Sequence, residues 1–215
     1  MSTDHYFAQQ PAGRRRGRRT FSVLLRGHQV RLTTEAGVFS RQRVDPGTRL
    51  LIQHLELSPT DRFLDLGCGY GVVGIVAALL APQAHITLLD INQRAVALAR
   101  ENLRANNLQN AAVLHGDGLT PLAGQTFDVI ALNPPIRAGL RVVHRLIEQS
   151  NDHLSPTGRF YLVGRTKQGV VRLAQKMTQV FGQVEELAKR SGYRLYLCHS
   201  ATLLCEARYA GRRRE

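Results

Sequence analysis

Apolar residues along this chain recur in two patterns, one typical of strands and one typical of helices. From Arg62 onward, segments with these two patterns alternate. Short apolar runs predict strands at residues 62–66, 85–89, 111–114, 127–132, 159–163, 184–188 and 193–198. Between them, apolar residues recur at helical spacing, as at residues 142–147. Alternating strands and helices predict an α/β fold, a mostly parallel sheet covered on both faces. The final two strands, joined by a tight turn at Ser191-Gly192, should be antiparallel.

A different pattern precedes this repeat. Apolar residues alternate on both sides of Arg26-Gly27-His28, which predicts a β-hairpin beginning at Phe21. Asp45 followed by Pro46 predicts a capped helix start, with the helix running to about Leu57. We therefore expect four parts along the chain: a flexible Arg-rich tail at 1–20, a hairpin plus helix packing on the domain at 21–58, the main domain at 59–208, and a basic tail at 209–215.

Charge narrows the range of partners. The chain of 215 residues carries a formal net charge of +13 and has a pI of about 10.8, which favours a polyanionic partner. Arginines at 14, 15, 16, 18, 19, 212, 213 and 214 supply eight of these charges. Such tails can be purely solubilising, but the rest of the chain is also basic, which favours RNA.

Other compositional features exclude whole classes of protein. No apolar run approaches the roughly 18 residues of a membrane span, and the N-terminus has no apolar core like that of a signal peptide. Cys68, Cys198 and Cys205 lack C-x-x-C spacing, so the sequence predicts neither a disulfide framework nor a metal site. We expect a cytoplasmic protein with reduced thiols.

A glycine-rich turn, Gly67-Cys68-Gly69-Tyr70-Gly71, directly follows the strand predicted at 62–66. Ligands of open α/β sheets bind beyond the carboxyl ends of the strands, and glycines allow the backbone to approach a flat adenosine. Asp90 ends the next predicted strand, where it can accept hydrogen bonds from both ribose hydroxyls. Asp117 follows the third, where it can accept from the adenine amino group. The sequence thus predicts a site for a nucleoside cosubstrate.

The same turn also matches a dinucleotide motif, because residues 69–74 read G-x-G-x-x-G. Asp65 argues against NAD, since a pyrophosphate would meet its negative charge, whereas the methionine ammonium group of S-adenosylmethionine would be attracted. A dehydrogenase would also need a substrate domain, for which little chain remains. An NAD-binding oxidoreductase stays a remote alternative.

Asn133, followed by Pro134 and Pro135, ends the apolar strand predicted at 127–132. The Asn133 side-chain oxygen and the Pro134 carbonyl can each accept one N–H of an exocyclic amine and so aim its lone pair at a sulfonium methyl. Proline keeps this backbone stiff. Catalysis would rest on orientation and fixed dipoles and would need no general base of tuned pKa. The alternative is an ordinary turn that closes a strand.

At these residues the chain resembles class I methyltransferases of the "methyltransferase small" group, most closely the single-domain relatives of ribosomal small-subunit RNA guanine-N2 methyltransferases. The likeness covers roughly residues 5–198 and rests on 5–7, 37–40, 44–48, 65–71, 90–92, 133–139 and 166–169. It implies a Rossmann-like seven-stranded sheet of order 3-2-1-4-5-7-6, with the hairpin as an N-terminal extension. It also implies that S-adenosylmethionine is the methyl donor, leaving S-adenosylhomocysteine as product.

These lines of reasoning give a set of candidate site residues. Asn133 and Pro134 are the candidate catalytic residues. Candidates for holding the cosubstrate are Asp65, Gly67, Cys68, Gly69, Gly71, Asp90, Ile91, Asp117, Gly118 and Asn133. Candidates for the methyl acceptor are Phe39, Arg41, Arg43, Pro135, Ile136, Arg137, Arg141 and Lys167.

Two departures from the family pattern affect the target. Ile136 stands where adenine-N6 and glutamine-N5 methyltransferases usually place an aromatic residue, which leaves Phe39 as the candidate for stacking on the base. Leu140 stands where close relatives often have lysine, so Arg137 or Arg141 would supply that charge. We expect methyl transfer to guanine N2 of ribosomal RNA, either naked or in a subunit. Methylation of another RNA base, a protein glutamine or a small molecule, and a non-catalytic RNA-binding role, remain alternatives.

Overall fold

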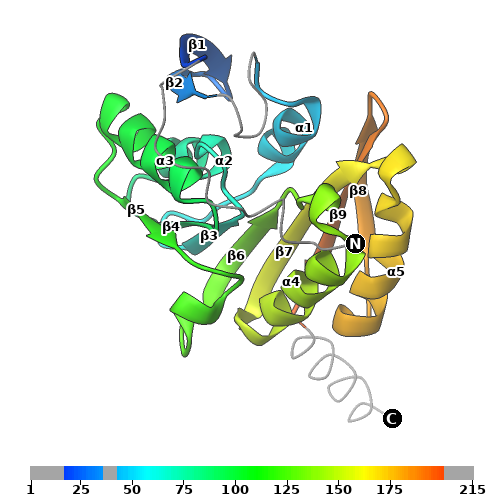
Figure 1. Cartoon of the computed structure of the whole chain (residues 1–215). Helices are drawn as coiled ribbons and strands as arrows, with labels where there is room; N and C mark the ends of the chain where they lie inside the picture. Colours follow the sequence, from blue (N-terminus) through cyan, green and yellow to red (C-terminus); the bar gives the residue numbers. More distant parts are fainter. Residues whose placement is uncertain (1–16, 36–42, 201–215) are drawn as a thin grey trace.

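A seven-stranded mixed sheet of order β5-β4-β3-β6-β7-β9-β8 forms the centre of the computed structural model, which describes residues 17–35 and 43–200 (Figure 1). Its strands are β3 (Arg62–Leu66), β4 (His85–Asp90), β5 (Ala111–His115), β6 (Phe127–Leu132), β7 (Leu154–Arg165), β8 (Glu185–Arg190) and β9 (Tyr193–His199). Counted from β3, this is the order 3-2-1-4-5-7-6. The predicted fold is confirmed, including the antiparallel pairing of β9 with both of its neighbours.

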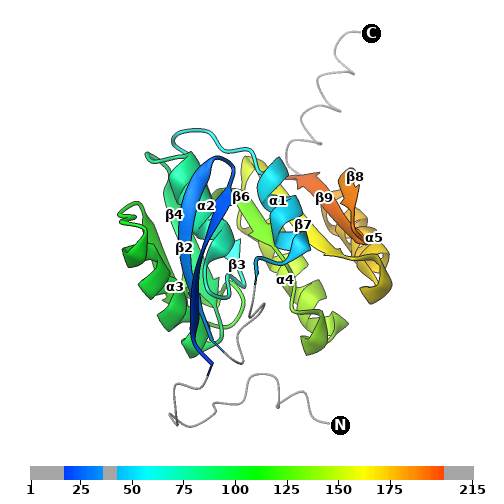
Figure 2. The same ribbon diagram turned by 90° about the horizontal axis from the view of Figure 1, so that it is seen from above.

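Helices cover both faces of the sheet. They are α1 (Pro46–His54), α2 (Val72–Leu80), α3 (Gln93–Ala105), α4 (Leu140–Asp152) and α5 (Val170–Phe181), with 3₁₀ turns η2 (Thr120–Leu122), η3 (Ile136–Ala138) and η4 (Thr166–Gln168). Helices α1, α2 and α3 pack on one face and α4 and α5 on the other (Figure 2). Neighbouring residues of a central strand are therefore buried on opposite faces, as Phe63 and Leu64 are. In the described part of the chain, no helix is both long and apolar enough to cross a membrane.

Helix α1 starts where its sequence predicts. The side-chain oxygen Oδ2 of Asp45 accepts hydrogen bonds from the backbone N–H groups of Gly47 (2.9 Å) and Thr48 (3.2 Å), and Pro46 occupies the first turn. The helix ends at His54, about three residues earlier than the apolar spacing suggests. Its start is thus fixed to within one residue by local chemistry.

The N-terminal hairpin, β1 (Arg19–Leu25) and β2 (His28–Thr34), is present as predicted and begins two residues earlier, at Arg19. Its turn residues Arg26 and Gly27 both have positive φ, 49° and 84°, as two-residue hairpin turns require. The Arg26 guanidinium reaches from this turn to the last carbonyls of α1, at Ile52, Gln53 and Leu55, each 3.1 Å away. A cation at this end of a helix is favourable, so the turn also holds α1.

Asn102 in α3 and Asn106 directly after it pair with the outer edge of β2. Asn102 Oδ1 accepts from Thr33 N (2.7 Å), and Asn102 Nδ2 donates to the carbonyls of Thr33 and Tyr70, each at 2.9 Å. Asn106 makes the same two-way pairing with the backbone of Arg31. These amides take the place of a third strand, and Asn102, which is fully buried, also fixes the glycine-rich turn.

We expect Asn102→Ala to lower the free energy of unfolding by about 3 kcal/mol, because three hydrogen bonds are lost in the interior and their backbone partners stay buried without replacement. Asn106→Ala, at a half-buried site with water nearby, should cost only about 1 kcal/mol. Urea unfolding followed by circular dichroism compares the two variants. Equal losses would contradict this role of Asn102.

Candidate active site

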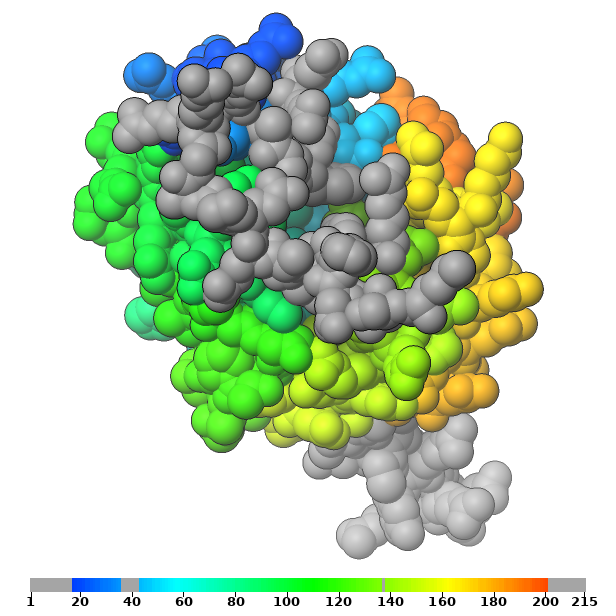
Figure 3. All heavy atoms as spheres, viewed as in Figure 1, coloured from blue at the N-terminus to red at the C-terminus, as the bar shows by residue number. Residues whose placement is uncertain are grey.

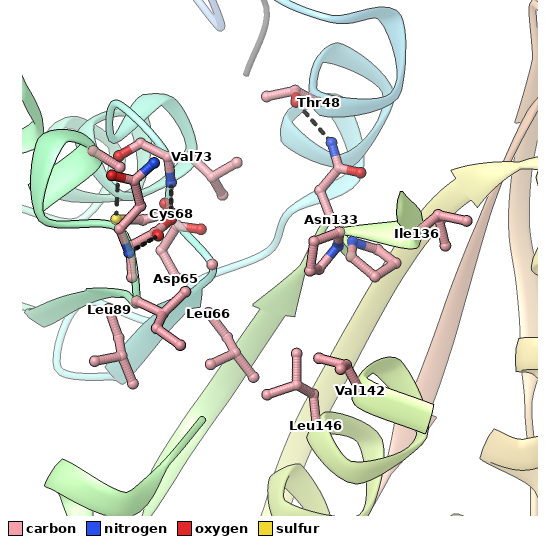
Figure 4. A pocket seen from close by; sticks show the side chains of 18 of the residues that line it. Thr48, Asp65, Leu66, Cys68, Val73, Leu89, Asn133, Ile136, Val142 and Leu146 are labelled. Atoms are coloured by element: carbon pink, nitrogen blue, oxygen red, sulfur yellow. Dashed lines mark hydrogen bonds between the residues drawn. The ribbon is translucent and has the colours of Figure 1, made fainter. Parts of the chain in front are cut away.

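A cavity of about 740 Å³ opens at the carboxyl ends of the parallel strands, a volume suited to a nucleoside-sized ligand. It brings together most of the predicted site residues, namely Asp65, Gly67, Cys68, Gly69, Asp90, Ile91, Asp117, Gly118, Asn133, Pro134, Pro135 and Ile136. Asp65 and Cys68 lie on one side of it and Asn133 on the other (Figure 4). The cosubstrate candidates and the amine-binding candidates therefore share one cavity.

The glycine-rich turn is drawn onto the end of β4. Gly67 N and Cys68 N donate to the carbonyl of Leu89 at 2.8 and 3.0 Å, and Gly69 N donates to Asp90 Oδ2 at 2.8 Å. Gly67 and Gly69 have φ values of 72° and 58°, which other residues rarely adopt. The turn therefore presents bare backbone to the cavity.

Gly71, predicted to contact the cosubstrate, is not among the residues that line the cavity. It precedes α2 with a φ of 93°, and a Cβ there would lie 3.2 Å from that of Ala99. The structure thus gives Gly71 a role in turning the chain and packing α2 against α3. A direct contact with the cosubstrate stays a prediction.

Asp65 is a buried carboxyl group with only 4% of its surface exposed. Its Oδ2 accepts a hydrogen bond from Gly74 N (2.8 Å) in the first turn of α2. Burial raises the pKa of Asp65 to about 7; the Gly74 hydrogen bond opposes this rise and the nearby charge of Asp90 adds to it. A cation bound in the cavity would favour the ionised form of Asp65.

Asp90 has a structural role besides its predicted one. Its two oxygens accept from Gly69 N and Asn92 N, both at 2.8 Å, so it joins the glycine-rich turn to the start of α3. Burial raises the pKa of Asp90, while the hydrogen bonds from Asn92 and Gly69 oppose that rise. Each carboxylate oxygen has more than one lone pair, so Asp90 can still accept hydrogen bonds from ribose hydroxyls.

Asp117 and Cys68 flank the same cavity with different surroundings. Asp117 is exposed and pairs with Arg145 of α4, an ion pair of little energetic weight at the surface. Burial raises the pKa of the Cys68 thiol, and the negative charges of Asp65 and Asp90 raise it further. Cys68 therefore stays a neutral thiol in the cavity wall.

Asn133 follows the last residue of β6 and lies between α1 and α4 (Figure 4). Its Nδ2 donates to Thr48 Oγ1 at 3.1 Å. The Pro134 carbonyl accepts from Ile136 N at 2.9 Å, which closes an inverse γ-turn around Pro135. A carbonyl oxygen has two lone pairs, so Pro134 retains one for a ligand.

Three of the remaining acceptor-side candidates lie outside the lining of the cavity, and the other three are not described well enough to place. Arg43, Arg141 and Lys167 are exposed and do not line the cavity. Phe39 and Arg41 fall outside the described residues, and of Arg137 only the backbone is described. What stacks on the target base therefore stays a prediction.

The cavity also contains residues that the sequence analysis missed as site residues. Tyr193 OH donates to Asp45 Oδ1 at 2.6 Å and accepts from Arg165 Nε at 2.8 Å, and all three residues line the cavity. Further unpredicted lining residues are Thr48, Tyr70, Val142, Leu146 and Gln168. Val142 and Leu146 had one detectable signal, since they lie on the apolar face of a predicted helix. Asp45, Thr48, Tyr70 and Gln168 stand in the stretches 44–48, 65–71 and 166–169, on which the family resemblance rests, whereas Arg165 and Tyr193 carry no motif.

A family model described as the methyltransferase small domain matches residues 29–197. The chain belongs to this family. It is 36% identical over 193 residues to YbxB of Bacillus subtilis (strain 168), covering 89% of this chain and 96% of that protein. It is 34% identical over 180 residues to ribosomal RNA small subunit methyltransferase C of Pseudomonas entomophila (strain L48), covering 82% of this chain and 53% of that protein.

A solved structure shares the fold closely. The T. Thermophilus 16S rRNA N2 methyltransferase (RsmC), in complex with AdoMet and guanosine, matches with a TM-score of 0.77 and 28% identity, covering 85% of this chain and 50% of that chain. The chain thus spans about half the length of the ribosomal RNA methyltransferases that it matches. The predicted family and its cosubstrate, S-adenosylmethionine, are confirmed, and the dinucleotide alternative is set aside.

A pH dependence follows from Asp65. Because its pKa is raised to about 7 in the free protein, the ammonium group of S-adenosylmethionine should bind more tightly as Asp65 ionises. We expect the affinity measured by calorimetry to rise roughly tenfold between pH 6 and pH 8 and then to level off. In Asp65→Asn the affinity should be lower and this rise should be absent. Equal pH profiles for the two proteins would contradict the contact; the ligand's own titration is common to both.

Proposed function

We propose that this protein transfers the methyl group of S-adenosylmethionine to an exocyclic nitrogen of RNA, namely guanine N2 of ribosomal RNA. The observation that carries the proposal is the position of Asn133 and Pro134 in the same cavity as the glycine-rich turn and Asp65. The match to the 16S rRNA N2 methyltransferase, whose structure contains guanosine, supports this choice of target.

The lining residues suit the parts of the cosubstrate. The glycine-rich turn and Asp65 would receive the methionine end, and Asp90 the ribose hydroxyls. Asp117 and the backbone at Gly118 would meet the adenine edge, with Ile91 supplying apolar contact to the ring. Once bound, S-adenosylmethionine supplies a methyl group on a positively charged sulfur.

On the acceptor side, Asn133 and Pro134 would orient the amine. Their two oxygens accept its two N–H groups, which turns the nitrogen lone pair toward the methyl carbon. As the new N–C bond forms, the C–S bond breaks and its electron pair stays on sulfur. The nitrogen then loses one proton to solvent, so no buried base is required.

Ile136 weakens two of the alternative targets, adenine N6 and glutamine N5. It lines the cavity and is half-buried, but it provides no aromatic face of the kind expected for adenine-N6 or glutamine-N5 substrates. Guanine N2 methylation is therefore the function that the site supports best.

Exposed cations beside the cavity suit an RNA backbone. Arg190 and Arg165 each lie opposite Tyr193 in neighbouring strands, so all three side chains share one face of the sheet. Lys167 is close by, because Thr166 N donates to Gly192 O (2.9 Å) in the β8–β9 turn. We name Arg165, Lys167 and Arg190 the basic strip. Together with the arginines of the two tails, the basic strip would bind the backbone of cytoplasmic RNA.

The main test combines product analysis with one variant. The protein is incubated with unmodified ribosomal RNA and labelled S-adenosylmethionine, and the modified nucleoside is identified. Asn133→Ala should lower kcat by about 10²–10³, as loss of a preorganised polar contact does, and leave cosubstrate affinity unchanged. Near-normal turnover by Asn133→Ala would contradict the proposed mechanism. If the methylated nucleoside is not N2-methylguanosine, the target is a different nitrogen or a different base.

Replacing cations of the basic strip tests the RNA contact. Lys167→Ala and Arg190→Ala should each reduce the slope of log affinity against log salt by about 0.7, the value for one phosphate of single-stranded RNA. Arg104→Ala is the matched control, since Arg104 is an exposed cation in the last turn of α3, at the opposite end of the strands. If all three variants keep the same slope, the strip does not contact phosphate.

A further inference from the structure

The side chain of Asn133 has a hydrogen-bond partner 85 positions earlier in the chain. Its Nδ2 donates to the hydroxyl of Thr48, in the first turn of α1, and this bond joins the end of β6 to the N-terminal extension (Figure 4). We propose that Thr48 is a positioning residue that fixes the Asn133 amide with its oxygen available to the methyl acceptor. The inference rests on the proposed function. The third of its tests is independent of that function.

The orientation of this amide decides whether it can bind an amine. An asparagine side chain has one oxygen that accepts and one NH₂ group that donates. Only the oxygen can receive an N–H of the target, and a half-turn of the amide would set two donors against each other. The Thr48 hydroxyl accepts from Nδ2 and so leaves Oδ1 for the target. In this orientation the amide would present Oδ1 to the acceptor before the acceptor binds.

Thr48 is itself held firmly. Its side chain is 7% exposed, and its backbone N–H donates to Asp45 Oδ2 at 3.2 Å. The other oxygen of Asp45 accepts from Tyr193 OH, which in turn accepts from Arg165 Nε. The backbone of Gly47 packs directly on the Tyr193 ring, since a Cβ there would lie 2.5 Å from Cδ1. The hydroxyl of Thr48 is therefore placed by contacts that originate on β7 and β9.

The Thr48 hydroxyl is not needed to attach α1 to the protein. Leu50, Leu51 and Ile52 bury the helix in the core, and Arg26 binds its last carbonyls. Valine has nearly the shape of threonine, with a methyl group in place of the hydroxyl. Thr48→Val therefore removes the acceptor of the Asn133 bond and keeps the packing, which makes it a specific probe.

Single-turnover and steady-state assays with RNA provide the first test. Thr48→Val should lower kcat by roughly 5- to 10-fold, the equivalent of one hydrogen bond, with KM for RNA and the affinity for S-adenosylmethionine unchanged. Thr48→Ser, which keeps the hydroxyl, should stay within about twofold of the parent protein. Equal losses in the serine and valine variants would overturn the inference, as would a loss confined to KM.

The second test repeats Thr48→Val in the Asn133→Asp background. A carboxylate has two equivalent oxygens, so its orientation needs no selection and either oxygen can accept an amine N–H. The valine substitution should then change kcat by less than about twofold. An undiminished effect in this background would show that Thr48 acts through the fold and not through the amide, and would overturn the inference.

The third test needs no activity. In ¹⁵N-labelled protein, the side-chain NH₂ signal of Asn133 is identified by its absence from Asn133→Asp. That signal should shift and exchange faster with solvent in Thr48→Val, and stay in place in Thr48→Ser. An unchanged signal in Thr48→Val would contradict the hydrogen bond between Asn133 and Thr48. If the parent protein methylates no RNA, the proposed function fails, and this spectrum still decides the role of Thr48 as the amide's partner.

Discussion

Backbone N–H groups directed at two carboxyl groups, one buried and one half-buried, fix the geometry of the chain where β3 and β4 end. Asp65 binds the first turn of α2 through Gly74 N, and Asp90 binds both the glycine-rich turn and the start of α3. Removing two carboxyl groups from water is costly, and these donors offset much of that cost. Because each bond joins two elements, strand ends and helix starts are fixed relative to one another before any ligand enters.

The N-terminal extension contributes two residues, Asp45 and Thr48, to the lining of the cavity. Helix α1 contributes Thr48 and its cap Asp45, and both meet residues that lie far along the chain, Asn133 and Tyr193. Helix α1 packs against β7, β8 and β9, and in the space-filling view its light-blue surface adjoins the orange surface of this part of the chain (Figure 3). The site therefore joins a segment outside the repeating strand–helix pattern to the end of β6 and to β9.

Local chemistry made much of this predictable. The periodicity predicted the strands and helices, and Asp45 marked a helix start that the structure confirms. The order of the strands came from family resemblance, because spacing alone does not encode it. The unpredicted features are polar pairs between distant residues, separated by 85 positions for Asn133 and Thr48 and by 148 for Tyr193 and Asp45. Such pairs have no period, so only the folded chain reveals them.

The pairing of α3 with the hairpin has a consequence for synthesis. The backbone of Thr33 finds its partner in Asn102, 69 positions later, so a ribosome makes the outer edge of β2 long before the groups that will cover it. Until α3 emerges, this edge offers unpaired N–H and C=O groups to any neighbouring strand. The hairpin is thus made before α3 and completed only after it, and the nascent chain is exposed to mispairing during that interval.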